Sequence, residues 1–242
     1  MSYFHALNNS GIGINSFNPG SFLSGYDWDI DPEVITGADG DPVIDAFDVS
    51  GAGLHYGQNT TLRQPTIKRA IYNGHDAIRF GTNKCLVPDP TARNFGSANT
   101  LICVCTPSAA AEYILAGSSS EGRPAFLSGF LAAFEYWNRS SSIGERSTFS
   151  PTATGLHILT LARTDDVGNY IGYYDGIEVF NVAVNTSRDW TVNSISVIGA
   201  LTAGSSQYSG DIARIIHYSQ NHAGAAGLTS LHAAIKARWG TP

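Results

Sequence analysis

The residues best suited to ligand chemistry lie in the stretch "FEYWNRSSS" at 134–142. Tyr136 and Trp137 carry rings that can stack on the C–H faces of a sugar, and Asn138 and Arg139 can pair with its hydroxyl groups. The four residues stand at the end of a predicted strand that enters a polar loop. They are therefore the first candidates for ligand contact.

A second aromatic stretch, "NYIGYYDG" at 169–176, adds Tyr173 and Asp175 to the candidate ligand-binding residues. In a strand, successive side chains point to opposite faces, so Tyr173 faces away from Tyr170 and Tyr174. About half of these rings must therefore belong to the core.

The chain lacks the paired carboxylates that most glycoside-cleaving enzymes use. No two of its six glutamates lie within four residues of each other. Glu135 in "AAFEYWNR" is the best single acid, because flanking aromatic rings would raise its pKa by desolvation, although a solvated strand residue is the simpler interpretation. No Gly-x-Ser-x-Gly, His-Glu-x-x-His or phosphate-loop motif occurs. We expect no enzyme activity and no catalytic residue.

The one cofactor for which the sequence offers ligands is a structural calcium ion, because calcium takes clustered oxygen ligands from loops. "DWDIDP" places Asp27, Asp29 and Asp31 at alternating positions, and "GADGDP" and "RTDDVGN" are further acidic turns. None has the glycine and terminal glutamate of an EF-hand loop, and hydrogen bonding within turns explains the aspartates equally well. We assign no metal ligands and expect no other cofactor.

Histidines in strand or helix patterns, and all the cysteines, are expected to pack in the interior rather than to bind a ligand. Cysteines two apart in one strand are poor disulfide partners. These residues are His157, His217, His232, Cys85, Cys103 and Cys105.

The composition argues against nucleic acid and membrane partners. The formal net charge is −6, and no Lys/Arg run or basic stripe occurs. Charged residues make up 14% of the 242 residues, compared with about a quarter in an average soluble protein. The beginning of the sequence does not resemble a secretory signal, and no apolar run is long enough to span a bilayer. We therefore expect synthesis in a cytoplasm and no membrane insertion.

Short apolar windows separated by turn residues predict an all-β sandwich or barrel. Asp175-Gly176 between two β-rich runs predicts a tight hairpin, because glycine readily adopts positive φ. The windows are 42–47, 76–80, 100–106, 112–117, 155–164, 169–176, 177–184, 193–201 and 211–219.

The C-terminal stretch "SGDIARIIHYSQNHAGAAGLTSLHAAIKARWG" predicts a last strand followed by one helix. In regular alternation, Ile212, Arg214, Ile216 and Tyr218 would face one way, and the residues between them the other. An apolar stripe with helical spacing, ending at Trp239, predicts a helix that caps an end or edge of the sandwich. Its members are Leu228, Leu231, Ile235 and Trp239.

Four motifs, in this order, resemble the laminin-G-like, concanavalin A-like jelly rolls of bacterial surface proteins and bacteriophage virions. They are the turn carried by Asp48, Ser50, Gly51 and Gly53; the "P…N-G-x-x-A-x-R-F" pattern of 65–80; the strand pair ending at Asp175-Gly176; and the final strand and helix. Two positions depart from the pattern: Ala46 stands where tryptophan is frequent, and Arg214 where an acidic residue is frequent.

The resemblance implies a jelly-roll β-sandwich of two antiparallel sheets with one short C-terminal α-helix, spanning 26–242. Residues 1–25, rich in Asn, Ser and Gly, are expected to form an extended N-terminal arm. By this resemblance the chain is a virion surface protein, a capsid or tail decoration or spike component that contacts host glycans. Its partners would then be other virion proteins, bound through the arm, and further copies of itself.

Two alternatives remain open at this stage. The chain could be a free carbohydrate-binding, lectin-like module, or it could be a glycan hydrolase or lyase. Glycan affinity in solution supports the first alternative, and converging carboxylates in a groove would support the second.

Overall fold

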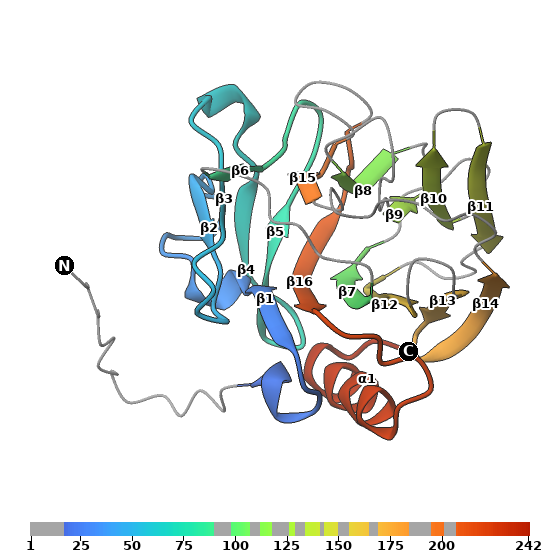
Figure 1. The fold of residues 1–242 in the computed structure, drawn as a ribbon. Coiled ribbons are helices and arrows are strands. Elements are labelled where there is room, and N and C mark those ends of the chain that lie inside the picture. The colour runs from blue at the N-terminus through green and yellow to red at the C-terminus, as the bar shows by residue number, and fades with distance from the viewer. Residues whose placement is uncertain are drawn as a thin grey trace.

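The computed structural model describes residues 17–89, 98–106, 112–117, 126–128, 134–140, 143–149, 155–164, 169–183, 195–200 and 207–242. For residues 112, 116, 117, 195 and 196, and for the strands between 126 and 149, the description covers the backbone only. The described residues form antiparallel strands, three short 3-10 helices and one α-helix (Figure 1). No helix among them is long and apolar enough to cross a membrane.

The first layer of the molecule is an eight-stranded antiparallel sheet with β16 near its centre. β1 (Tyr26–Ile30) pairs with β16 alongside this path of strands. The path runs β14 (Ile177–Ala183), β13 (Asn169–Tyr174), β12 (His157–Arg163), β7 (Asn99–Cys105), β16 (Asp211–Tyr218), β5 (His75–Arg79) and β4 (Thr66–Tyr72).

The second layer consists of a five-stranded and a three-stranded sheet, joined by a β-bridge between Leu86 and Ile198. The five-stranded sheet runs β11 (Ile143–Phe149), β10 (Phe134–Ser140), β9 (Phe126–Ser128), β8 (Glu112–Gly117) and β15 (Ile195–Ile198). The three-stranded sheet runs β2 (Asp45–Phe47), β3 (His55–Gly57) and β6 (Val87–Asp89).

The main hydrophobic core lies between these layers. Side chains from the first layer, such as Trp28, Leu159 and Ile215, pack against Tyr56 and Leu115 of the second. Cys103 and Cys105 lie in this core, and all three cysteines are buried and free. The predicted β-sandwich and the predicted packing of the cysteines are confirmed.

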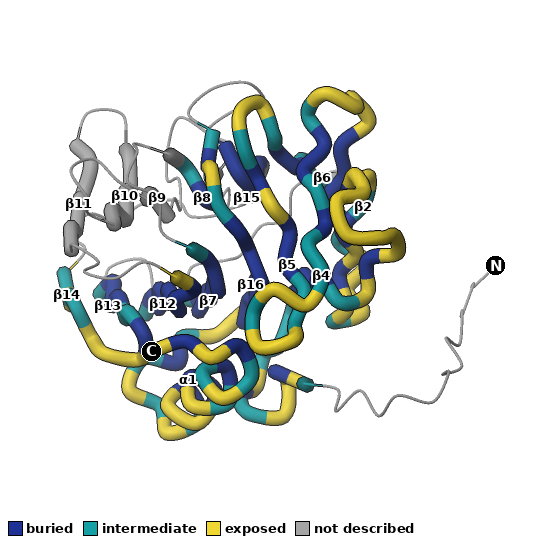
Figure 2. Tube along the Cα trace, turned by 180° about the vertical axis from the view of Figure 1, so that it is seen from behind, coloured by how far each residue is buried: buried dark blue, intermediate teal, exposed yellow. Residues whose placement is uncertain are grey.

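Helix α1 (Ala226–Trp239) packs on the outer face of the first sheet, not on an end or edge of the sandwich as the sequence predicted. Its predicted apolar stripe is buried against Ile102 of β7, Ile158 of β12 and Ile216 of β16. Both faces of these strands are therefore covered, and Figure 2 shows them dark blue for burial along their length. Gly240 ends the helix in the left-handed conformation.

The hairpin predicted at Asp175-Gly176 is confirmed between β13 and β14. Both turn residues have positive φ, 50° at Asp175 and 80° at Gly176. This conformation matches the strand twist of a two-residue hairpin.

The alternation predicted for the last strand is wrong beyond its second residue. A register shift between Ile212 and Arg214 adds one residue to β16 opposite β7. As a result, Ile212 and Ile215 face the main core, while Ala213 and Ile216 face helix α1.

Residues 17–25, which the sequence assigned to the N-terminal arm, pack against helix α1 and the outer face of the first sheet. They include the 3-10 helix η1 (Pro19–Ser21), whose first turn is capped by the side chain of Asn18. Leu23 is buried with α1, and Phe17 packs against Trp239 with ring centroids 5.4 Å apart. The packed structure therefore includes residues before position 26.

His232 couples the helix to the sheet, because its Nε2 lies 2.8 Å from Oγ1 of Thr160 in β12. Burial, together with the nearby charge of Lys236, lowers the pKa of His232 to about 4. His157, His217 and His232 are all buried, as the sequence predicted.

We predict that the free energy of unfolding falls as the pH drops from about 7 to 4. In this range His232 becomes protonated in the unfolded chain but stays neutral in the folded protein. A pKa of about 4 instead of 6.5 corresponds to roughly 3 kcal/mol at most. Urea unfolding at several pH values measures this dependence. The His232→Gln variant, which keeps a polar partner for Thr160, should lose most of this slope; an unchanged slope would contradict the assignment.

Candidate functional site

The centre of the candidate site is Arg214, whose side chain is 2% exposed. Its Nε and Nη2 donate to the two carboxylate oxygens of Asp29, each at 2.6 Å, and its Nη1 donates to Asp31. Such a bidentate ion pair fixes both the position and the orientation of the guanidinium group. An ion pair therefore connects β1 and β16 in addition to their backbone hydrogen bonds.

Local structure brings these carboxylates to Arg214. In the β1–β16 pairing, Asp29 lies opposite Ile216, two residues from Arg214. Asp31 precedes the 3-10 helix η2 (Pro32–Val34) and caps it by accepting a hydrogen bond from the backbone N–H of Glu33. Asp31 thus follows the last residue of β1, caps η2 and accepts a hydrogen bond from Arg214.

Burial changes the proton affinity of this cluster. It raises the pKa of the Asp29 carboxyl, and the guanidinium of Arg214 opposes that rise. Burial alone would lower the pKa of Arg214, but Asp29 and Asp31 raise it above its usual value. Burial and the charge of Asp29 also raise the pKa of Tyr26, which stays a neutral donor to Asp29.

A second group of charges lies beside the first, where η2 approaches the end of α1. Glu33 accepts from Arg238 of α1 through one oxygen and contacts His75 Nδ1 of β5 through the other. The guanidinium of Arg238 lies over the ring of Phe17, 5.6 Å from its centroid, and that of Arg214 lies 5.7 Å from the same ring. The ring of Phe17 therefore contacts two cations.

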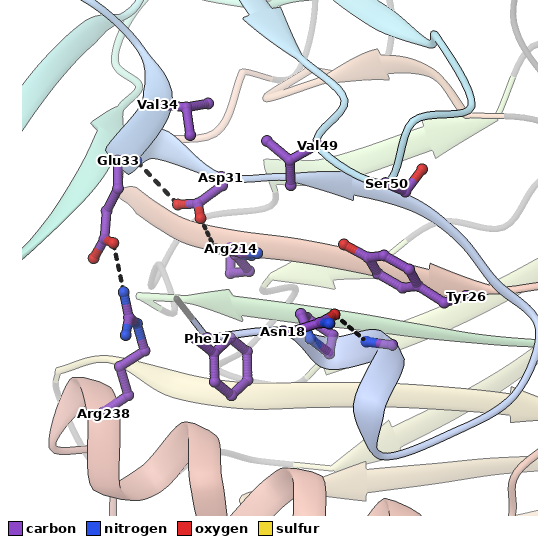
Figure 3. A pocket seen from close by; sticks show the side chains of 12 residues that line it. Phe17, Asn18, Tyr26, Asp31, Glu33, Val34, Val49, Ser50, Arg214 and Arg238 are labelled. Carbon is purple, nitrogen blue, oxygen red and sulfur yellow. Dashed lines mark hydrogen bonds and ion pairs between the residues drawn. The ribbon is translucent and has the colours of Figure 1, made fainter. Parts of the chain in front are cut away.

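A cavity of about 670 Å³ opens between these groups, and we call it the β1–α1 cavity. Figure 3 shows Glu33 and Arg238 on one side of it, Tyr26 on the other, and Arg214 between Asp31 and Phe17. The lining residues are Phe17, Asn18, Pro19, Gly20, Tyr26, Asp31, Glu33, Val34, Val49, Ser50, Arg214 and Arg238. Its size falls within the range of small-molecule sites, about 300–1,000 Å³.

The first group of predicted ligand residues, Tyr136, Trp137, Asn138 and Arg139, lies within β10 rather than at a strand end. β10 pairs with β9 and β11, and Trp137 lies opposite Arg146. Because strand residues alternate, Trp137 and Arg139 share one face of the sheet. The side chains of β10 lie outside the described residues, so their ligand contact stays a prediction.

The second group, Tyr173 and Asp175, makes contacts within the protein. Asp175 accepts from the backbone N–H of Ile158 at 2.8 Å and lies 2.7 Å from Nδ1 of His157. The hydroxyl of Tyr173 accepts from the backbone N–H of Gly224 at 3.1 Å. Neither residue lines the β1–α1 cavity, and their ligand contact also stays a prediction.

The aspartates considered for calcium have partners of another kind. Asp29 and Asp31 hold Arg214, and Asp27 lies 3.1 Å from Nδ1 of His217. Within the described ranges, no three His, Cys, Asp or Glu side chains come together as a metal-ligand group. A structural calcium ion, which the sequence left as an alternative to simple turns, stays untested.

No sequence pattern predicted the β1–α1 cavity. Its walls come from segments near both ends of the chain, such as Phe17 and Arg238. One signal did exist: Arg214 stands where the resembled family frequently has an acidic residue. A basic residue at such a position indicates an acidic partner elsewhere in the fold, and "DWDID" supplies three aspartates.

The two layers and the outer helix define this chain as a β-sandwich protein. No protein-family model matches it. No curated protein matches its sequence.

Solved structures with a similar fold include the botulinum neurotoxin serotype D binding domain, with a TM-score of 0.66 at 10% identity over 90% of this chain. A second similar structure concerns botulinum neurotoxin type C, whose cell entry is dependent upon interaction with two ganglioside molecules. It has a TM-score of 0.54 and 9% identity over 90% of this chain. The neurotoxin DC binding domain in complex with rat synaptotagmin II has a TM-score of 0.54, 9% identity and 87% coverage.

This chain spans about half the length of these structures, covering 54%, 53% and 52% of them in turn. At this level of identity the likeness establishes a shared fold. Function resides in sites that differ among proteins of one fold, so it must be argued from the residues.

We predict that Arg214→Ala lowers the free energy of unfolding by about 3–5 kcal/mol, because it leaves buried Asp29 and Asp31 without their countercharge. Denaturant unfolding measures the loss. Lys68→Ala is the matched control, because Lys68 pairs with the exposed Asp39 and should leave stability unchanged. Equal effects of the two substitutions would show that the buried network does not stabilise the fold.

Proposed function

We propose that this protein is a non-enzymatic, carbohydrate-binding jelly roll displayed on the surface of a bacteriophage particle, as a capsid or tail decoration or spike component. The observation that carries the binding role is the fold of 90% of the chain, which is similar to that of the botulinum neurotoxin D binding domain and to a structure of neurotoxin type C, whose cell entry depends upon interaction with two ganglioside molecules. The low content of charged residues and the motif resemblance support the virion setting.

The proposed glycan-contacting surface is the five-stranded sheet around β10. Tyr136, Trp137, Asn138 and Arg139 supply rings for stacking and groups that bond hydroxyls. A sheet face suits extended oligosaccharides, because several sugar residues can lie along it. Tyr173 and Asp175 are retained as candidate contacts of the same function.

A free lectin-like module is the nearest alternative, and it would use the same surface. A glycan hydrolase or lyase is a further alternative, with Glu135 of β10 as its candidate acid. Cleavage of host polysaccharide by the unsubstituted protein would contradict the non-enzymatic proposal, and Glu135→Gln would then test the role of Glu135, because unchanged cleavage by the variant excludes it as the acid.

We predict that the protein retains oligosaccharides on a broad glycan array and that Trp137→Ala weakens this retention about tenfold, as expected from losing a stacking ring. Leu62→Ala is the control, because Leu62 is 82% exposed on η3 (Thr61–Arg63) and should have no effect. An array with no retained glycan would contradict the carbohydrate-binding role.

The proposed anchoring role of the N-terminal arm has its own test. Deleting residues 1–16 spares the packing of Phe17 and Leu23, whereas deleting 1–25 removes it. We predict that the shorter deletion folds normally but fails to join virus particles during assembly, as measured by its amount in purified particles. Normal incorporation would contradict the anchor.

A further inference from the structure

We propose that the β1–α1 cavity is a second carbohydrate site, which binds a single uncharged sugar residue or the end of a neutral chain. The inference rests on the proposed function, since it takes carbohydrate as the ligand class. It concerns a site separate from β10.

The cavity combines rings with fixed polar groups. Tyr26 is half-buried and offers aromatic surface to a sugar ring, beside Phe17, whose own ring Arg214 and Arg238 already contact. Asn18 accepts from Gly20 N at 3.0 Å through its Oδ1, which leaves its amide N–H groups as donors. Rings and hydrogen-bonding groups on one wall are what a polyhydroxylated ligand requires.

The carboxylates of the cavity keep acceptor capacity. An ionised carboxylate offers about four acceptor sites. Asp31 accepts from Arg214 and from Glu33 N, and Glu33 contacts His75 and Arg238. Both side chains remain partly exposed, 12% for Asp31 and 19% for Glu33, so sugar hydroxyls can donate to them.

The site is organised before any ligand arrives. Arg214 and Asp29 are buried and bonded to each other, and Arg214 in turn holds Asp31. A ligand that binds such a wall does not need to immobilise the side chains itself.

Charge selects against acidic sugars. The cavity lining holds two carboxylates, Asp31 and Glu33, and two guanidinium groups, Arg214 and Arg238. Both guanidinium groups are already paired with carboxylates. The carboxylate of a sialic or uronic acid would have to compete with Asp29, Asp31 and Glu33 for these guanidinium groups, so an uncharged sugar is preferred.

The test uses ligand-observed NMR with free monosaccharides on full-length protein carrying Trp137→Ala, so that the β10 surface does not contribute. The probes are glucose, galactose, mannose and N-acetylglucosamine, with sialic acid and glucuronic acid as acidic counterparts. We expect at least one neutral sugar to bind and both acidic sugars to fail.

Two variants localise the binding. Val34 lines the cavity and is 42% exposed, so Val34→Trp should fill the cavity without removing a buried contact and weaken neutral-sugar binding about tenfold. Leu62→Trp is the matched control on an exposed site and should bind like its parent. Glu33→Gln should also weaken binding about tenfold, by removing a charged acceptor.

Binding of no neutral sugar, equal binding of acidic sugars, or unchanged binding by Val34→Trp would overturn the inference. The two sites are separated by their variants: the array experiment reads the loss that Trp137→Ala causes, whereas these outcomes are read in a protein that already lacks Trp137. The failure of one site is therefore distinguishable from the failure of the other.

Discussion

The structure depends on a buried guanidinium group that must be neutralised. Arg214 lies in β16, which contacts β1, β5 and β7 in the first sheet. An unpaired charge there would cost several kcal/mol, which is why Asp29 and Asp31 must be held against it. The pairing ties the first described strand to the last one and orients η2, which carries Glu33 toward α1.

The β-bulge in β16 and this charge pair belong together. The extra residue reverses the alternation after Ile212, so that Ile215 enters the main core and Ile216 the layer beneath α1. Arg214 lies at the bulge and reaches the cavity wall beside Phe17. A local irregularity of the strand thus places a charged group where the N-terminal segment and the C-terminal helix meet.

The parts of the fold that could be predicted from sequence are those set by local interactions. The Asp175-Gly176 turn follows from the positive φ of two residues, and the stripe ending at Trp239 follows from helical periodicity. The position of α1 on the sheet depends on which strands are buried on both faces, and periodicity does not report that. The bulge adds a residue without any local signal, so regular alternation gave the wrong faces.

The candidate site was harder to predict because its members are distant in the chain. Arg214 and Asp29 are 185 residues apart, and Arg238 and Glu33 are 205 apart. The rings in "FEYWNRSSS" stood out because they are adjacent in sequence, whereas Phe17 and Tyr26 draw no attention singly. Opposite charges at unusual positions were the one long-range signal, and they became interpretable once β1 and β16 were known to be neighbours.

The central claim is that an organised polar and aromatic cavity on this β-sandwich binds carbohydrate. A crystal structure of the protein soaked with a neutral disaccharide tests it most directly. The account predicts a sugar ring against Tyr26 with hydroxyl groups bonded to Glu33 or Asp31. A disaccharide bound elsewhere, with the β1–α1 cavity holding solvent, would contradict it.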